Sequence, residues 1–173
     1  NELMLNADIE PKQQKILLKA TLDQAQRMNN LIADLISLNR VDTTKHILRD
    51  KKVMVTDLKN QILSSLSSLR LKKNISFEFN IDSKKNILGS FSEVYSALEN
   101  LVSNAFRYTD KGSISINWSI IKGQGILSVT DSGIGISKEH LTKITDRFYR
   151  VDTDRSRNSG GTGLGLAIVK NIM

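Results

Sequence analysis

A glycine-rich run that leads directly into an apolar segment constrains the fold of this chain more than any other stretch. Four of the ten glycines lie between positions 160 and 165, and the apolar run Leu164–Ile172 overlaps them. A glycine loop before a helix leaves backbone N–H groups unpaired, and these donors form an anion site with the positive end of the helix dipole. The run therefore predicts either a phosphate-binding loop or a flexible loop before a packed helix.

The composition excludes several other kinds of site. The 173 residues are enough for one domain with an appendage. The chain has no cysteine, which excludes a disulfide framework and a thiolate metal site, and its two histidines, His46 and His140, have no metal-ligand spacing. No apolar run approaches the roughly 20 residues of a membrane-spanning helix, and no signal peptide is readable.

The net charge of +7 is compatible with a protein that binds nucleic acid. The lysines are scattered, however, and aromatic residues are few. The tightest group of arginines, at positions 147, 150, 155 and 157, lies beside the glycine run. Arginines in that place suit a polyphosphate ligand at least as well, so we expect no nucleic-acid partner.

Residues 11–40 predict one long helix that begins after acidic residues and at Pro11. Its apolar residues recur every three or four positions on one face: Leu18, Leu22, Ala25, Met28, Ile32, Leu35 and Leu38. One apolar stripe of this length needs partner helices, so we expect an antiparallel pair that a second chain doubles into a four-helix bundle. The alternative is that the helix lies on the globular domain.

The polar stretch 41–51 predicts a linker. We therefore divide the chain into a partial helical domain at 1–42, a linker at 43–51 and a second domain at 52–173.

The second domain predicts an α+β fold with helices on one face of a mostly antiparallel sheet. Alternating apolar residues predict strands over 75–81, 114–118 and 126–130, and a turn joins the last two. Shorter strands are expected at 52–56 and 87–88.

Three helices are expected in the same domain, each opened by a short polar residue. The first follows Asp57 as its cap, the second begins at Ser90 or Ser92, and a short third helix begins at Ser137.

Two asparagines stand out on the helix after Ser92. Asn100 and Asn104 are four residues apart and share one face, and Arg107 and Tyr108 follow on the next turn. Asparagine is a poor helix former, and its amide oxygen is able to hold a Mg²⁺ that is already bound to phosphates. Arg107 is then placed to contact the phosphates. The alternative is a pair of solvated asparagines on the exposed face.

A carboxylate followed by two glycines comes directly after a predicted strand, in Asp131-Ser-Gly-Ile-Gly135. An aspartate there is able to accept a hydrogen bond from an exocyclic amine such as that of adenine, although a plain strand-to-helix turn is the alternative. The run lacks the third glycine of a dinucleotide fingerprint, and neither glycine run has the lysine and Ser/Thr of a P-loop.

An aromatic pair, Phe148-Tyr149, precedes a polar and arginine-bearing segment at 152–159. This pattern indicates a lid that orders over a ligand, with an ordinary surface loop as the alternative.

The order and spacing of these groups resemble the sensor histidine kinases of two-component systems. Residues 98–109 look like the N box of that family, 131–135 like the G1 box, 147–150 like the F box and 161–169 like the G2 box. The residues of the last two boxes are most similar to those of the phosphate-regulon sensor subgroup.

The resemblance covers nearly the whole chain and implies a fold. Residues 11–40 look like the second helix of the dimerisation and histidine phosphotransfer domain. Residues from about 50 onward look like the catalytic ATP-binding domain, a layered α/β sandwich of the Bergerat type shared with gyrase B, Hsp90 and MutL.

The resemblance also implies a role for individual residues. Asn104, helped by Asn100, binds Mg²⁺, and Arg107 contacts phosphate. Tyr108 packs near the adenine, and Asp131 accepts from the adenine amine. The residues that shape the pocket, its lid and its phosphate side are Gly133, Gly135, Ile136, Phe148, Arg150, Gly161, Thr162, Gly163, Leu164 and Gly165. The implied reaction is transfer of the ATP γ-phosphoryl group to a histidine and then to a response-regulator aspartate.

Two departures from the family pattern matter. The chain has no phosphoacceptor box, and neither His46 nor His140 stands in one. It also stops before the closing strands of the fold. We therefore expect a fragment that binds ATP, does not phosphorylate itself, and belongs to a cytoplasmic domain that missing upstream segments attach to the inner membrane.

Two alternative functions stay open. An ATP-hydrolysing relative places a glutamate where this chain has Asn100, and Glu99 is rotated by about 100° around the helix. The other alternative is a non-catalytic dimerisation or scaffold module that uses the nucleotide as a switch or has lost its nucleotide site. The intact glycines argue against such a loss.

Overall fold

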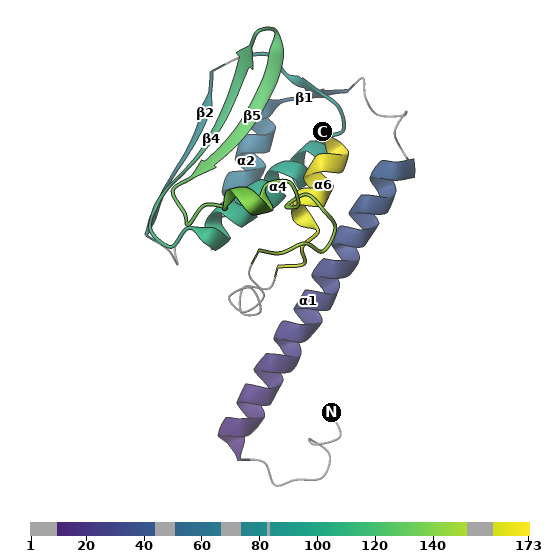
Figure 1. Cartoon of the computed structure of the whole chain (residues 1–173), viewed down its shortest axis with the longest axis vertical. Helices are drawn as coiled ribbons and strands as arrows, with labels where there is room; N and C mark the ends of the chain where they lie inside the picture. The colour runs from purple at the N-terminus through teal and green to yellow at the C-terminus, as the bar shows by residue number, and fades with distance from the viewer. Residues whose placement is uncertain (1–9, 44–50, 67–73, 83, 152–160) are drawn as a thin grey trace.

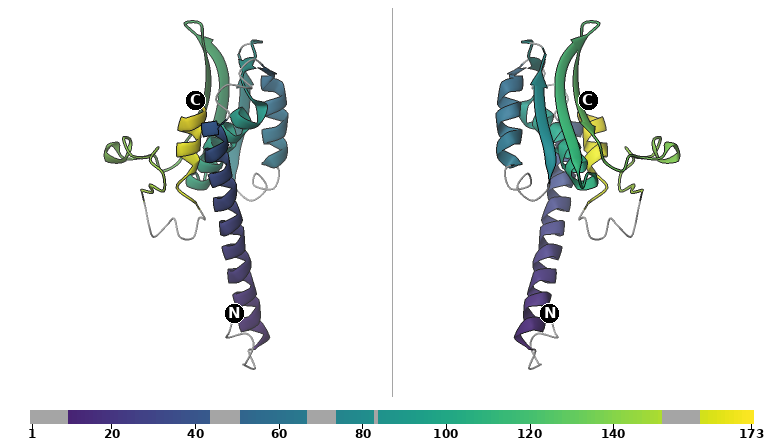
Figure 2. Two further views of the ribbon diagram at one scale, coloured as in Figure 1. Left: turned by 90° about the vertical axis from the view of Figure 1, so that its right-hand side faces the viewer. Right: turned by 90° about the vertical axis from the view of Figure 1, so that its left-hand side faces the viewer.

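The computed structural model describes residues 10–43, 51–66, 74–82, 84–151 and 161–173, with the backbone alone for 37–43. The long helix α1 (Pro11–Thr43) extends away from a layered domain, in which helices cover one face of a sheet (Figures 1 and 2).

The main sheet has the order β2-β4-β5, formed by Ile75–Ile81, Gly112–Ile121 and Gln124–Asp131. Strand β2 pairs parallel to β4, and β4 pairs antiparallel to β5. The short strands β1 (Lys52–Val53) and β3 (Ile87–Leu88) form a separate antiparallel pair. The sheet is mixed, and the predicted α+β class is confirmed.

Helices α2 (Val55–Ser65), α4 (Phe91–Tyr108) and α6 (Gly165–Ile172) lie on the same side of this sheet (Figure 1). The alternation along β4 explains why, since Ile114, Ile116 and Trp118 are buried under the helices. They pack in one core with buried residues of α2 and α4, among them Leu58 and Leu98. Each such side chain contributes about 1.5–3 kcal/mol of burial free energy, so this core fixes where α4 stands relative to β5.

The start of the second domain corrects two predictions. The strand expected over 52–56 ends at Val53, and Asp57 is not the cap of the next helix. Helix α2 begins earlier because Met54 is extended and its carbonyl already accepts hydrogen bonds from the N–H groups of Asp57 and Leu58. Asp57 instead lies in the first turn, where a carboxylate favours the helix dipole.

The other predicted helix starts hold with small changes. Ser90 precedes α4, but its hydroxyl bonds to the Ser92 hydroxyl and not to a backbone N–H. The short helix after Ser137 is a single 3₁₀ turn, η2 (Lys138–His140), because its hydrogen bonds span three residues.

Helix α1 begins at Pro11 as predicted and continues to Thr43, three residues beyond the expected end. Most of its apolar stripe is exposed, including Leu18, Leu22 and Met28. One segment does contact the domain, since Leu31 packs on the buried residues Leu164 and Ile168 near α6. Among the described side chains of α1, Leu31 thus contacts the globular domain, whereas Leu18, Leu22 and Met28 remain more than half exposed. The predicted tail at 1–8 and most of the predicted linker lie outside the described residues.

Candidate functional site

A cavity of about 880 Å³ lies between α4, the loop before α6, the turn after β5 and one side of α1. Its volume is in the range of sites for nucleotide-sized ligands. The elements that enclose it come from distant parts of the chain. One core joins α4 to the sheet, and a second apolar cluster around Leu164 and Ile168 joins the start of α6 to α1 through Leu31.

Helix α4 forms one wall of the cavity, lined by Asn100, Asn104, Arg107 and Tyr108. Asn100 is held in one orientation, because its Nδ2 donates a 2.9 Å hydrogen bond to the Ser96 carbonyl. Its Oδ1 therefore faces the start of α6, where a Cβ on Gly165 would come within 2.5 Å of it. The glycine at position 165 lets α6 approach α4 this closely.

The loop before α6 forms the second wall, and it is joined to the segment that carries Phe148. The N–H of Phe148 donates a 2.9 Å hydrogen bond to the Gly163 carbonyl. Gly163 has a φ of +74°, and a Cβ there would lie 2.9 Å from the Phe148 backbone. Glycine at this position is required on both grounds, so the two segments form one unit.

The turn after β5 closes the far end of the cavity. The N–H of Gly133 donates a 2.9 Å hydrogen bond to Oδ1 of Asp131, and the N–H of Ile134 donates to the Tyr108 carbonyl at 3.3 Å. The first bond orients the Asp131 carboxylate at the strand end, and the second holds the turn against the end of α4.

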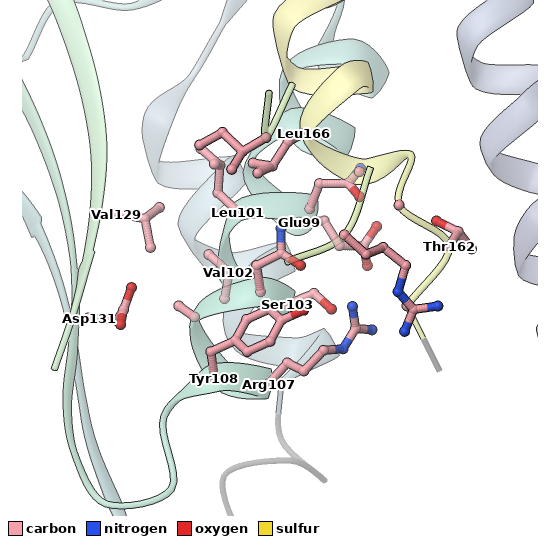
Figure 3. A pocket seen from close by; sticks show the side chains of 18 of the residues that line it. Glu99, Leu101, Val102, Ser103, Arg107, Tyr108, Val129, Asp131, Thr162 and Leu166 are labelled. Carbon is pink, nitrogen blue, oxygen red and sulfur yellow. The ribbon is translucent and has the colours of Figure 1, made fainter. Parts of the chain in front are cut away.

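Charged groups lie at two opposite ends of the cavity. Figure 3 shows Asp131 on β5 at one side, Tyr108 in the middle, and Arg107 and Thr162 at the other side. Arg107 reaches the glycine loop, since its Nη1 would lie 2.9 Å from a Cβ on Gly161. Leu101, Val102 and Val129 line the space near Asp131. A carboxylate at one end and a guanidinium with a glycine loop at the other suit a base joined to phosphates.

Comparison with known proteins gives the family. Residues 89–173 match the family described as histidine kinase-, DNA gyrase B-, and HSP90-like ATPase. The phosphate regulon sensor protein PhoR of Pseudomonas aeruginosa is 40% identical over 96% of this chain and 38% of its own length. That of Haemophilus influenzae is 36% identical over 99% of this chain and 40% of its own length. The chain belongs to the sensor histidine kinase family.

The fold is also similar to that of solved histidine kinases. The full-length histidine kinase ShkA, solved in complex with AMPPNP, superposes with a TM-score of 0.74 at 25% identity, over 96% of this chain and 35% of that one. The chain thus spans about two fifths of the length of the curated relatives quoted above. Within the described residues no helix is long and apolar enough to cross a membrane.

Most of the predicted site residues meet in the one cavity. The predicted site residues of α4 (Asn100, Asn104, Arg107 and Tyr108) and Asp131 line it. The others that line it are Gly135, Ile136, Arg150, Gly161, Thr162, Gly163 and Gly165. Three others lie next to the cavity and outside its lining. Gly133 stands in the turn and orients Asp131. The Leu164 side chain is fully buried, and the Phe148 side chain is 60% exposed.

Several lining residues were not predicted. Tyr149 of the F box faces the cavity, and its hydroxyl lies 2.7 Å from Nδ1 of His140, which anchors the F box to η2. Helix α1 adds Asn30, Ala33 and Asp34. The sequence offered one weak signal for the last of these, because Asp34 is a carboxylate three residues after the apolar Leu31.

Glu99 also lines the cavity, beside Asn100. Its Oε1 accepts a 3.0 Å hydrogen bond from the Tyr95 hydroxyl one turn earlier on α4. Burial raises the pKa of Tyr95, with the nearby Glu99 charge as a further cause, so the hydroxyl stays protonated and able to donate at neutral pH. The Glu99 carboxylate is thereby held along the helix.

Proposed function

We propose that this chain is the ATP-binding catalytic part of a sensor histidine kinase, which transfers the γ-phosphoryl group of ATP to a histidine outside this chain. The observation that carries the proposal is the cavity with Asp131 at one end and Arg107 with the G2 loop at the other. The family match over residues 89–173 supports it.

The base end is assigned to Asp131. One carboxylate oxygen accepts from the Gly133 N–H, which leaves the other to accept from the adenine amine. Tyr108 and Ile136 line the same region and offer apolar surface to the ring. Gly135 has a φ of +70°, and a Cβ on it would have no atom within 4 Å, so the turn is open at this position.

The phosphate end is assigned to Arg107, Arg150 and the G2 loop from Gly161 to Gly165. The two guanidinium groups supply positive charge and fixed donors for phosphate oxygens. The loop supplies backbone N–H groups at the start of α6, where the helix dipole favours negative charge. Phe148 is joined to the G2 loop by the hydrogen bond from its backbone N–H to the Gly163 carbonyl.

The N box supplies the donor set that fits Mg²⁺. Asn104 lines the cavity on α4, and Asn100 lies one turn earlier; amide oxygens of this kind are ligands for Mg²⁺. We assign the metal contact to Asn104, helped by Asn100, whose amide the Ser96 carbonyl orients. Bound Mg²⁺ neutralises phosphate charge in the transfer step, and the protein contributes by positioning.

We place the phosphoacceptor on another segment or chain, because neither histidine of this chain stands in a phosphoacceptor box. His140 bonds to Tyr149 and is not among the residues that line the cavity, and His46 lies outside the described residues. We propose that residues 1–42 are a partial dimerisation domain, 43–51 a linker and 52–173 the catalytic domain. The exposed apolar face of α1 supports a homodimer through residues 11–40.

The remaining partners follow from the family. We propose that the phosphoryl group passes from the histidine to the aspartate of a response-regulator receiver domain, and that the phosphate-regulon relatives mark the subgroup. We further propose a cytoplasmic position, with attachment to the inner membrane through upstream segments.

ATP hydrolysis is the second candidate, because a glutamate lines the cavity. Glu99 is one position from Asn100 and is therefore rotated by about 100° around α4. Its bond to Tyr95 holds the carboxylate along the helix. A base in that position is not aimed at a water beside the metal, which favours transfer to a protein.

The test is a calorimetric titration with a non-hydrolysable ATP analogue, with and without Mg²⁺. We expect binding by the wild-type chain, its loss in Asp131→Asn, and loss of its Mg²⁺ dependence in Asn104→Ala. Wild-type binding that neither substitution alters would refute the assigned site.

A further inference from the structure

Helix α1 reaches the G2 loop through one charged hydrogen bond. The hydroxyl of Thr162 donates to Oδ2 of Asp34 at 2.7 Å, over 128 positions in the sequence. The same hydroxyl oxygen accepts from the N–H of Leu164 at 3.2 Å. The chain Leu164–Thr162–Asp34 therefore links the first residues before α6 to the side of α1. In Figure 3 Thr162 lies on the side of the cavity that faces α1.

An apolar contact lies directly beside this bond. Leu31, one turn before Asp34, packs on the buried residues Leu164 and Ile168. Other apolar residues of α1, such as Leu22 and Met28, are more than half exposed. Among the described side chains of α1, Leu31 and the cavity-lining residues Asn30, Ala33 and Asp34 therefore lie beside the catalytic domain.

The position of Asp34 brings its charge into conflict with a polyphosphate. Asp34 lines the same cavity as Arg107 and Gly161, where the proposed function places the phosphates. A carboxylate at this side of the cavity repels them. Thr162 has a single hydroxyl proton, so it donates either to Asp34 or to a phosphate oxygen.

We propose that the Asp34–Thr162 pair is a latch that holds α1 on the catalytic domain in the nucleotide-free state and opens when nucleotide phosphates enter. This inference rests on the proposed function and adds a coupling between the nucleotide site and the dimerisation helix. Asp34 acts through Thr162 and is a positioning residue.

Linkage fixes the direction of the effect. A bond present in the free state and lost in the bound state lowers nucleotide affinity, and the nucleotide weakens the bond by the same factor. Removal of the Asp34 carboxylate should therefore tighten binding of an ATP analogue by about two- to tenfold, the range expected for one hydrogen bond of this kind.

The first test compares Asp34→Ala and Asp34→Asn with wild type in a calorimetric titration with Mg-AMPPNP. The matched control is Asp23→Ala, which makes the same charge change eleven residues, or about three turns, earlier on the same face of the helix. Asp23 is exposed and outside the cavity lining. We expect tighter binding in both Asp34 variants and an unchanged affinity in the control.

Each outcome of this test is informative. Unchanged or weaker binding in Asp34→Ala, with a normal wild type, would overturn the latch and leave the proposed function intact. If the wild type itself bound no analogue, the proposed function would fail first.

The second test measures the position of α1 directly. The chain has no cysteine, so spin labels attach only at the two positions changed in Gln26→Cys and Glu78→Cys, which are both exposed. Labelled chains are diluted in unlabelled ones so that only distances within one chain are measured. We expect Mg-AMPPNP to broaden or shift the distance distribution in the wild type, and Asp34→Ala to show that change without nucleotide. A distribution that neither perturbation alters would overturn the latch.

Discussion

Gly165→Ala tests the packing on which the site depends. Gly165 is the first residue of α6, and an added Cβ would stand 2.5 Å from Oδ1 of Asn100. The amide cannot swing away without loss of its hydrogen bond to the Ser96 carbonyl. Two effects therefore oppose each other, the higher helix propensity of alanine and the steric conflict between α4 and α6.

The magnitudes decide the sign. Alanine is favoured over glycine by at most about 1 kcal/mol in a helix interior, and less at its first position. Overpacking of a tight contact costs about 1–3 kcal/mol. We expect a net loss of about 1–2 kcal/mol in the free energy of unfolding, which for a chain of this size lowers Tm by about 2–8 °C.

The assay is a double-mutant cycle followed by urea and thermal unfolding without nucleotide. Asn100→Ala removes the amide that the new Cβ meets, so Gly165→Ala should be neutral or stabilising in that background, with a coupling of about 1–3 kcal/mol. If Gly165→Ala were equally tolerated in both backgrounds, the close approach of α6 to Asn100 would be refuted.

Two further predictions concern the core and the F box. Ile116 is fully buried on the central strand, so Ile116→Ala should lower the free energy of unfolding in urea by about 2–5 kcal/mol. Ile121 is 52% exposed at the end of the same strand, and Ile121→Ala should lower it little. Equal losses would contradict the assigned burial. Tyr149→Phe removes the hydroxyl that lies 2.7 Å from His140 and should lower stability by about 0.5–1.5 kcal/mol. His140→Ala should cost less in the Tyr149→Phe background than in the wild type, because the contact with the hydroxyl is already lost there. Full additivity in thermal unfolding would show that the two side chains act apart.

The sequence predicted the parts of the fold that depend on local patterns. Ile114, Ile116 and Trp118 alternate clearly, and their strand was expected because burial of one face needs that period. The start of α2 was misplaced because Asp57 has the chemistry of a cap, whereas the chain conformation at Met54 decides where the helix begins. The parallel pairing of β2 with β4 depends on how distant segments pack and has no local signal.

The candidate site shows the same division. Asn100, Asn104 and Arg107 were predicted to share a wall because helical spacing places them on one face. Their meeting with Asp131 and the G2 loop was implied by the family resemblance alone. The contribution of Asp34 was missed, because the approach of α1 to the G2 loop joins residues that no sequence period relates.

The central claim is that the cavity binds ATP with the base at Asp131 and the phosphates at Arg107 and the G2 loop. A crystal structure of the chain with Mg-AMPPNP tests it most directly. The account predicts the adenine amine at about 3 Å from an Asp131 carboxylate oxygen, and phosphate oxygens against Arg107 and the backbone of Gly161–Gly165. A nucleotide bound elsewhere, or one with its phosphates beside Asp131, would contradict it.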